Sequence, residues 1–155
     1  MPAAVATLSA LVVALAGGVL TTTGPWYRAL RNPAWKPPDW AFGPVWATIF
    51  ALCVVSAILA WSGADEARRV VLLAAYAVNG VLNIAWSALF FRAERPDWAF
   101  RELVLLWLSV AALIAVTLPV SHLAALLLAP YLAWVTVAGF LNRAIVRLNG
   151  PFGAA

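Results

Sequence analysis

The sequence predicts an all-α membrane protein, a single-domain bundle of five transmembrane helices. The first observation is composition: 65% of the 155 residues are hydrophobic and only 10% are charged, whereas soluble domains carry roughly a quarter charged residues. The second is the separation of the charges. Uncharged apolar stretches of about 18 residues or more are typical of membrane-spanning helices. Four such stretches have no charged side chain: 1–27, 40–64, 70–91 and 103–142.

The last of these stretches must cross the membrane twice. As one helix, residues 103–142 would be about 60 Å long at 1.5 Å per residue, twice the ~30 Å hydrocarbon core. We expect the chain to turn at 119–122, where Pro119, Ser121 and His122 supply a helix breaker and a capping hydroxyl. The five predicted spans are 4–23, 42–62, 69–91, 99–118 and 122–148.

Each span is predicted to be an α-helix, because in lipid the backbone must satisfy its own hydrogen bonds. The first span lacks the basic start of a signal peptide, and its apolar run is too long for one, so we expect it to remain as a helix. Pro130 lies inside the fifth span, where we expect a bend.

The positive charges predict the orientation. The side of the bundle that holds the connections 24–41 and 92–101 and the C-terminus has eight of the ten Lys and Arg residues, and the other side has only Arg68 and Arg69. Short connections rich in Lys and Arg stay in the cytoplasm. We therefore expect a multi-pass protein of the bacterial inner membrane, with its C-terminus in the cytoplasm and its N-terminus outside. The net charge of +4 is explained by this topology and by anionic headgroups, so no nucleic-acid partner is predicted. The eight are Arg28, Arg31, Lys36, Arg92, Arg95, Arg101, Arg143 and Arg147.

The connection 24–41 differs from the other short connections. It contains four prolines, four aromatic residues and three cations. Such a chain is stiff and has little conformational freedom to lose on folding. Its aromatic residues suit the membrane interface, where Trp and Tyr are enriched. The segment is therefore either an interfacial aromatic belt or a rigid lid over a pocket between the helices.

One face of the third span carries polar side chains. Tyr76, Asn79, Asn83 and Trp86 follow one another at helical spacing. Two amides on one face in hydrocarbon need partners. Contact with another helix, worth ~0.6 kcal/mol per pair, and contact with a ligand explain this pattern equally well.

Aromatic residues mark one face of the second span and one face of the fifth. These faces hold Trp46, Phe50 and Cys53, and Trp134, Ala138 and Leu141. Such stripes more often pack in a core than bind ligands. Ala138 and Gly139 beside Trp134 nevertheless leave space next to a large ring, which suits a flat hydrophobic ligand. Ala14 and Gly18 in the first span form a small-xxx-small pair, and close helix approach is the favoured interpretation there.

Several kinds of chemistry are not expected. The six acidic residues are placed in connections or at the ends of spans, which argues against a proton-coupled carrier. The single His122 offers no second ligand for a metal and no catalytic triad. Neither a metal nor a haem cofactor is predicted, and catalytic residues are not assigned.

Three segments resemble the TspO/MBR family, the tryptophan-rich sensory proteins and mitochondrial translocator or peripheral benzodiazepine receptor proteins. They agree in order and spacing over about residues 5–149. The first is Trp26-Tyr27…Leu30…Asn32-Pro33-Ala34-Trp35-Lys36-Pro37-Pro38-Asp39-Trp40…Gly43-Pro44-Val45-Trp46, the second is Tyr76…Leu82-Asn83…Trp86…Phe90-Phe91, and the third is Pro130-Tyr131-Leu132-Ala133-Trp134 with Leu141-Asn142 and Arg147.

The resemblance implies a five-helix bundle whose pocket opens toward the first connection. It implies binding of porphyrins, especially protoporphyrin IX, and of other flat lipophilic molecules, as ligands rather than cofactors. It also implies a homodimer. The candidate ligand-binding residues, with Asn79 added from its helical face and Trp35 and Pro38 in the lid, are Trp35, Pro38, Trp46, Phe50, Asn79, Asn83, Trp86, Trp134, Ala138 and Leu141. Arg28, Arg31 and Lys36 are candidates to meet porphyrin carboxylates at the rim.

The sequence departs from the family pattern at three positions. Asn79 stands where Gln is usual, and Ala88 stands where Pro is frequent. Arg143 replaces an aromatic residue of the proposed cholesterol motif, itself a weak pattern. Cholesterol binding is therefore expected to be weak.

Three functions fit these observations. The favoured one is a membrane receptor or sensor that binds porphyrins and takes part in tetrapyrrole regulation, because small-molecule sites are apolar with a few polar groups. The second is an enzyme that degrades porphyrin with light and oxygen. The third is a transporter, against which the lack of visible inverted repeats argues.

Overall fold

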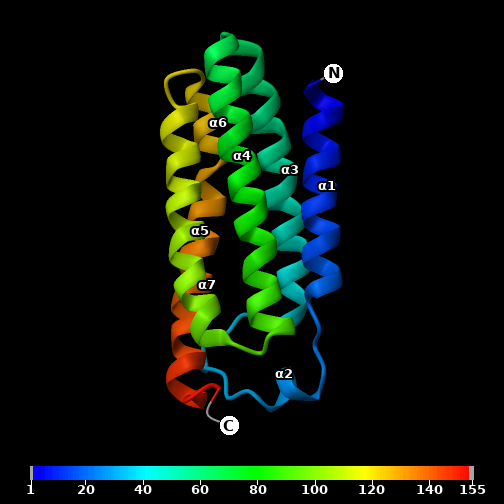
Figure 1. The fold of residues 1–155 in the computed structure, drawn as a ribbon, viewed down its shortest axis with the longest axis vertical. Helices are drawn as coiled ribbons and strands as arrows, with labels where there is room; N and C mark the ends of the chain where they lie inside the picture. Colours follow the sequence, from blue (N-terminus) through cyan, green and yellow to red (C-terminus); the bar gives the residue numbers. More distant parts are fainter. Residues whose placement is uncertain (1, 154–155) are drawn as a thin grey trace.

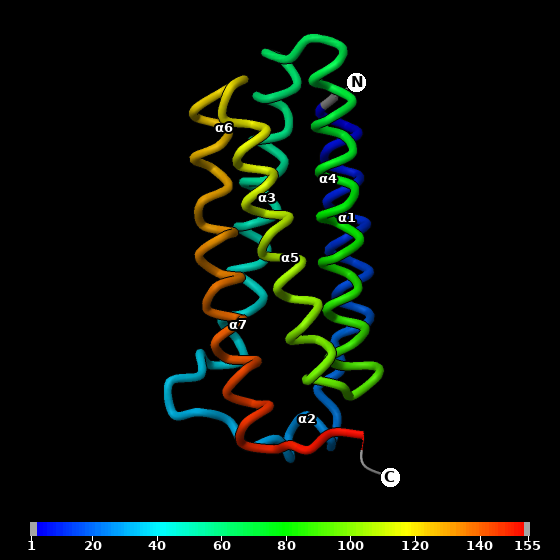
Figure 2. Tube along the Cα trace, turned by 60° about the vertical axis from the view of Figure 1, so that its left-hand side comes forward, coloured from blue at the N-terminus to red at the C-terminus, as the bar shows by residue number. Residues whose placement is uncertain are grey.

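The computed structural model describes residues 2–153 and confirms the predicted all-α bundle with five spans (Figures 1 and 2). The long helices run side by side, and the two termini lie at opposite ends of the bundle. Five helices are long and apolar enough to cross a membrane. The elements are α1 (Pro2–Leu20), α2 (Pro25–Ala29), α3 (Asp39–Gly63), α4 (Glu66–Ser87), the π-helical turn η1 (Ala88–Arg92), α5 (Pro96–Thr117), α6 (His122–Leu127) and α7 (Ala129–Asn149).

The bounds of the first two spans differ from the predicted 4–23 and 42–62. Helix α1 ends at Leu20, and the Thr21 hydroxyl donates a hydrogen bond to the Gly17 carbonyl. Three threonines before a Gly-Pro pair disfavour further helix, because β-branched residues and the residue before proline avoid that conformation. Helix α3 begins at Asp39, directly after the extended Pro38. It therefore includes three residues that were assigned to the loop.

Helices α4 and α5 each begin three residues before their predicted start. Asp65 caps α4, because its side chain accepts a hydrogen bond from the Arg68 amide at 2.8 Å. Pro96 occupies the first turn of α5, where its missing N–H costs nothing. At its other end, α4 continues as the wider η1 turn. The following residue Glu94 has a φ of 52°.

The predicted fifth span is divided into α6 and α7 at Leu128. Pro130 has no N–H to donate one turn back, so the helix is interrupted two residues before it. Ser121 caps α6 by accepting a hydrogen bond from the Ala124 amide. The expected turn at 119–122 and the irregularity near Pro130 are both present.

Helix α5 forms the centre of the packing, because it lies against both α4 and α7. The main core includes Leu106 and Val110 of α5 and Tyr131 and Val135 of α7, all buried. Two helix pairs approach closely at glycine. A Cβ on Gly80 would lie 3.1 Å from Val13 of α1, and one on Gly139 would lie 3.1 Å from Leu103 of α5. Small residues allow this close packing in membrane proteins.

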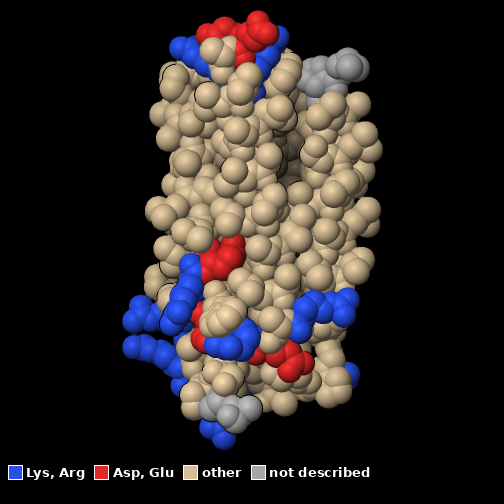
Figure 3. Space-filling view, in the orientation of Figure 1, with Lys and Arg blue, Asp and Glu red and all other residues tan. Residues whose placement is uncertain are grey.

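One acidic residue lies further inside a span than the others. Glu102 is in the second turn of α5, and it is only 9% exposed. Both of its carboxylate oxygens are buried without a hydrogen-bond partner among the described residues. On the face shown in Figure 3, the other charged side chains gather at the two ends and leave a broad uncharged belt between them.

A candidate ligand-binding cavity under the first connection

A partly open cavity of about 460 Å³ lies inside the bundle between α1, α3 and α4, with the first connection at its mouth. Its walls are mostly apolar, with a few polar groups, as is usual for small-molecule sites. The lining residues are Val13, Ala14, Gly17, Gly18, Thr21, Thr23, Tyr27, Asp39, Phe42, Gly43, Trp46, Ala47, Phe50, Asn83, Trp86, Ser87 and Phe91.

Aromatic rings from two helices form much of the cavity wall. On α3, Trp46 stacks on Phe50 with ring centroids 5.5 Å apart and an interplanar angle of 27°. Trp86 of α4 also lines the cavity, and it stacks at 5.3 Å and 29° on Phe90 of η1, which is buried behind the wall. The helical spacing of three and four residues brings each pair to one face. Two indoles from different helices thus line one apolar space.

The amides of α4 have separate roles. Asn79 donates to Ser109 of α5 at 2.9 Å and accepts from the Tyr131 hydroxyl of α7 at 3.2 Å. It joins three helices and does not line the cavity. Asn83 lines the cavity and also donates to Tyr131 at 3.0 Å. The sequence left two explanations open, contact with another helix and contact with a ligand. Asn79 contacts other helices, whereas Asn83 contacts another helix and also lines the cavity.

A second polar contact holds the indole of Trp86. Its Nε1 donates to the Asn142 side chain of α7 at 3.2 Å. Asn142 in turn donates to the carbonyl of Pro96 at 2.8 Å, and it is 1% exposed. The orientation of this cavity-lining ring is therefore fixed by a buried amide that connects the C-terminal half of α7 to the start of α5.

Small residues of α1 leave the third wall of the cavity open. Ala14, Gly17 and Gly18 all line it. A Cβ on Gly17 would meet only Ser87 Oγ, at 3.7 Å, and one on Gly18 would meet no atom within 4 Å. The close helix approach expected at Ala14 and Gly18 is therefore absent at Gly18. It occurs instead where α1 crosses Gly80.

The mouth of the cavity is polar. Tyr27 and Asp39 line it, and the Tyr27 hydroxyl donates to Asp39 Oδ1 at 3.0 Å. The Lys36 ammonium also binds Asp39 Oδ1, and it lies 5.0 Å from the centre of the Tyr27 ring. Desolvation favours a lower pKa for Lys36, but its hydrogen bonds to Asp39 and Tyr27 outweigh this, so the pKa is raised and the side chain stays charged.

The first connection is held down at two places. The Arg31 amide donates to Asn149 Oδ1 at 2.8 Å, and Asn149 Nδ2 donates to the Arg31 carbonyl at 2.9 Å. Near its other end, Trp26 lies edge-on to Phe90 with centroids 6.0 Å apart. These contacts hold the connection against the rest of the protein, and Figure 1 shows α2, which is part of the connection, at the lower end of the bundle.

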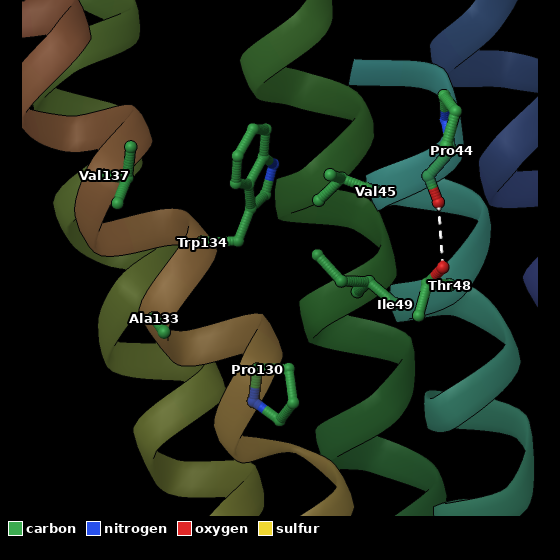
Figure 4. Close-up of a pocket in the computed structure, with 8 residues that line it drawn as sticks. All are labelled: Pro44, Val45, Thr48, Ile49, Pro130, Ala133, Trp134 and Val137. Atoms are coloured by element: carbon green, nitrogen blue, oxygen red, sulfur yellow. Dashed lines mark hydrogen bonds between the residues drawn. The ribbon is translucent and has the colours of Figure 1, made fainter. Parts of the chain in front are cut away.

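A separate groove, also of about 460 Å³, lies between α3 and α7. Figure 4 shows Trp134 reaching from α7 toward Val45 and Ile49 of α3. Among the described residues that line the groove, Thr48 carries the one hydroxyl, which donates to the Pro44 carbonyl at 2.9 Å. Trp134 also lies edge-on to Phe42 at 5.4 Å. Since Phe42 lines the cavity between α1, α3 and α4, this aromatic pair stands between cavity and groove.

The structure brings together four of the candidate residues in the cavity: Trp46, Phe50, Asn83 and Trp86. The remaining six are not among the residues that line it. Trp134 lines the groove, Leu141 is buried in the core near Phe90, and Ala138 packs against the core that includes Val135. Asn79 joins helices, and Pro38 precedes α3. Trp35 is 53% exposed.

The candidate rim cations do not line the cavity either. Lys36 is bound to Asp39, Arg28 lies in α2, and the Arg31 backbone is bound to Asn149. Sequence reasoning also missed functional positions. Tyr131 and Asn142 organise the polar contacts behind the cavity, and their only signal was the run of residues that they share with Trp134 and Leu141.

A bundle of five membrane-spanning helices around an apolar cavity defines a multi-pass membrane protein with the features of a small-molecule binding site. The chain matches the TspO/MBR family over residues 5–148. This chain belongs to the TspO/MBR family, which confirms the resemblance inferred from its motifs.

Characterised relatives match most of the chain. Protein CrtK of Rhodobacter capsulatus is 41% identical over 135 residues, which cover 86% of this chain and 84% of that protein. The human translocator protein is 39% identical over 126 residues, covering 80% and 75%. The tryptophan-rich protein TspO of Chlorobaculum tepidum is 37% identical over 145 residues, covering 90% of each.

Proposed function

We propose that this chain is a membrane receptor or sensor that binds flat lipophilic rings, with protoporphyrin IX as the representative ligand, and that it takes part in tetrapyrrole regulation or handling. The observation that carries the proposal is the placement of Trp46 and Trp86, on two different helices, in the wall of one apolar cavity. Flat aromatic ligands gain both area burial and ring contacts from such walls.

Other features support the same proposal. Asn83 places an amide in the cavity wall, where it can orient a ring by a single polar contact. Small residues of α1 leave room opposite the indoles. Relatives of this chain carry the names tryptophan-rich sensory protein and translocator protein, which agree with a role in sensing or handling a small molecule.

The test is a titration of the purified protein with protoporphyrin IX, followed by quenching of tryptophan emission. Trp46→Ala is expected to weaken binding about tenfold or more, because a ring pair contributes ~0.5–1.5 kcal/mol beyond area burial, and each 1.4 kcal/mol is tenfold in affinity. The control is Trp61→Phe near the far end of α3, where Arg69 covers the ring. Equal affinities of both folded variants and the parent would place the ligand elsewhere.

The same samples separate a sensor from an enzyme. In light and oxygen, a porphyrin bound beside Trp46 and Trp86 is placed for photochemistry with an indole. A new absorbing product that appears only in light, and only with Trp46 present, would favour the porphyrin-degrading enzyme. Saturable binding without product supports the sensor.

We propose further that the C-terminus faces the cytoplasm of a bacterial inner membrane. The end of the bundle with α2 and the C-terminus carries eight of the ten cations, and such ends stay in the cytoplasm. A fluorescent reporter fused to the C-terminus is expected to be bright, and a periplasm-active phosphatase fused there is expected to be inactive. Phosphatase activity at this position would reverse the orientation.

A further inference from the structure

We infer that Asp39 makes the cavity selective for flat ligands whose loop-facing edge is uncharged or donates hydrogen bonds, and that it disfavours edges that carry carboxylates. The inference rests on the proposed function and names the ligand class more narrowly. It departs from the expectation that three rim cations receive porphyrin carboxylates.

The first step is the charge at the cavity mouth. Among the residues of 2–153 that line the cavity, Asp39 is the only charged one. Its Oδ1 accepts hydrogen bonds from both Tyr27 and Lys36, while no described group donates to its Oδ2. Its side chain is 63% exposed. A free carboxylate oxygen therefore remains to accept a hydrogen bond from a ligand at the mouth.

The second step is the state of the nearest cation. Lys36 is already paired with Asp39, and its side chain is only 14% exposed, packed over the Tyr27 ring. A ligand carboxylate that binds this ammonium would share it with Asp39 and would lie beside a like charge. Like charges in such proximity disfavour one another, although solvent at the mouth reduces the effect.

The third step compares two ligands with the same ring. Protoporphyrin IX carries two carboxylates, whereas its dimethyl ester is neutral. The two ligands make the same ring contacts with the apolar walls and the indoles. A difference between their affinities therefore comes from the interaction of Asp39 with the groups at the ring edge. We expect the parent protein to favour the ester, and we expect this preference to weaken at high salt because charges near the surface are screened.

The experiment measures the affinities of the diacid and the ester for the parent and for Asp39→Asn. Asparagine keeps the shape of the side chain and a carbonyl acceptor for Tyr27, and it frees Lys36. The ratio of ester to diacid affinity is expected to fall about two- to fivefold, or ~0.4–1 kcal/mol, because Asp39 is exposed. The comparison between proteins cancels differences in how the two porphyrins partition into lipid or detergent.

The matched control is Glu94→Gln. It changes the net charge by the same amount at the same end of the bundle, on an exposed residue that does not line the cavity, so its ratio should equal the parent value. Lys36→Gln provides the opposite change, because it leaves Asp39 without its cation and should raise the ratio above the parent value.

The outcomes separate this inference from the proposed function. If both porphyrins bind the parent and Trp46→Ala weakens both, but Asp39→Asn and Lys36→Gln leave the ratio unchanged, charge selection by Asp39 is wrong and the binding cavity stands. A fall in the ratio that Glu94→Gln reproduces also overturns it, as an effect of net charge. If neither porphyrin binds the folded parent, the proposed function fails as well.

Discussion

Gly18→Phe is expected to abolish protoporphyrin binding while the helix bundle stays intact. Gly18 lines the cavity, and a Cβ at this position would meet no atom within 4 Å. A benzyl group can therefore occupy the space that a ligand ring needs without displacing neighbouring residues. Phenylalanine also favours the helix over glycine, so α1 should not be weakened. A loss of at least a hundredfold in affinity is expected, or ~2.8 kcal/mol.

The measurement is the same titration by tryptophan quenching, with thermal unfolding in detergent as a check on the fold. Ala4→Phe adds a benzyl group to the same helix at an exposed position outside the cavity, and it should bind like the parent. Undiminished binding by a folded Gly18→Phe protein would show that the ligand does not enter this cavity.

Asn142→Ala is expected to lower the stability of the bundle by ~2–4 kcal/mol. Asn142 is 1% exposed and bridges Trp86 of α4 and the Pro96 carbonyl of α5. Alanine leaves the Trp86 indole N–H without an acceptor in an apolar interior, at a cost of ~1–3 kcal/mol. It also removes the Asn142 hydrogen bond to the Pro96 carbonyl, a loss of ~0.5–1.5 kcal/mol. Polar contacts between membrane helices average only ~0.6 kcal/mol, so a loss above ~4 kcal/mol is not expected.

The check is unfolding by heat or by a denaturing detergent, compared with Ser62→Ala. Ser62 is exposed and donates only to the Ile58 carbonyl of its own helix, so its removal should change stability by less than about 0.5 kcal/mol. Equal stability of Asn142→Ala and the parent would mean that water or another side chain replaces the bridge.

The fold could be predicted because the membrane imposes simple rules on a sequence. Long uncharged stretches such as 70–91 have no other stable structure in lipid than a helix. The ends of the helices were harder to predict, because they depend on local contacts rather than on hydropathy. Asp65 and Pro96 start their helices within charged segments, which a criterion based on apolar residues does not include.

The site was predicted in part, for a comparable reason. Helical spacing places Asn83 and Trp86 on one face, and that face does line the cavity. Spacing within one helix does not determine which other helix a face meets. Trp134 therefore appeared as good a candidate for the cavity wall as Trp46, yet it lines the separate groove between α3 and α7. Only tertiary structure shows that Lys36 is bound to Asp39.

The glycine positions show the same limit. A small-xxx-small pair leaves room beside a helix. The sequence alone does not show whether another helix fills that room or whether it remains empty. At Gly80 the room is filled by the side chain of Val13, which would lie 3.1 Å from an added Cβ, whereas at Gly18 it is part of the cavity. The residue type is the same, and the neighbouring helix decides its role.

The paired hydrogen bonds between Arg31 and Asn149 have a consequence for biogenesis. The two residues are 118 positions apart, so a ribosome must add all the residues between them before the second partner exists. During membrane insertion, the connection 24–41 therefore cannot form these hydrogen bonds until α7 has been inserted. A nascent chain that stalls before residue 149 would therefore lack the two hydrogen bonds that hold the connection at Arg31.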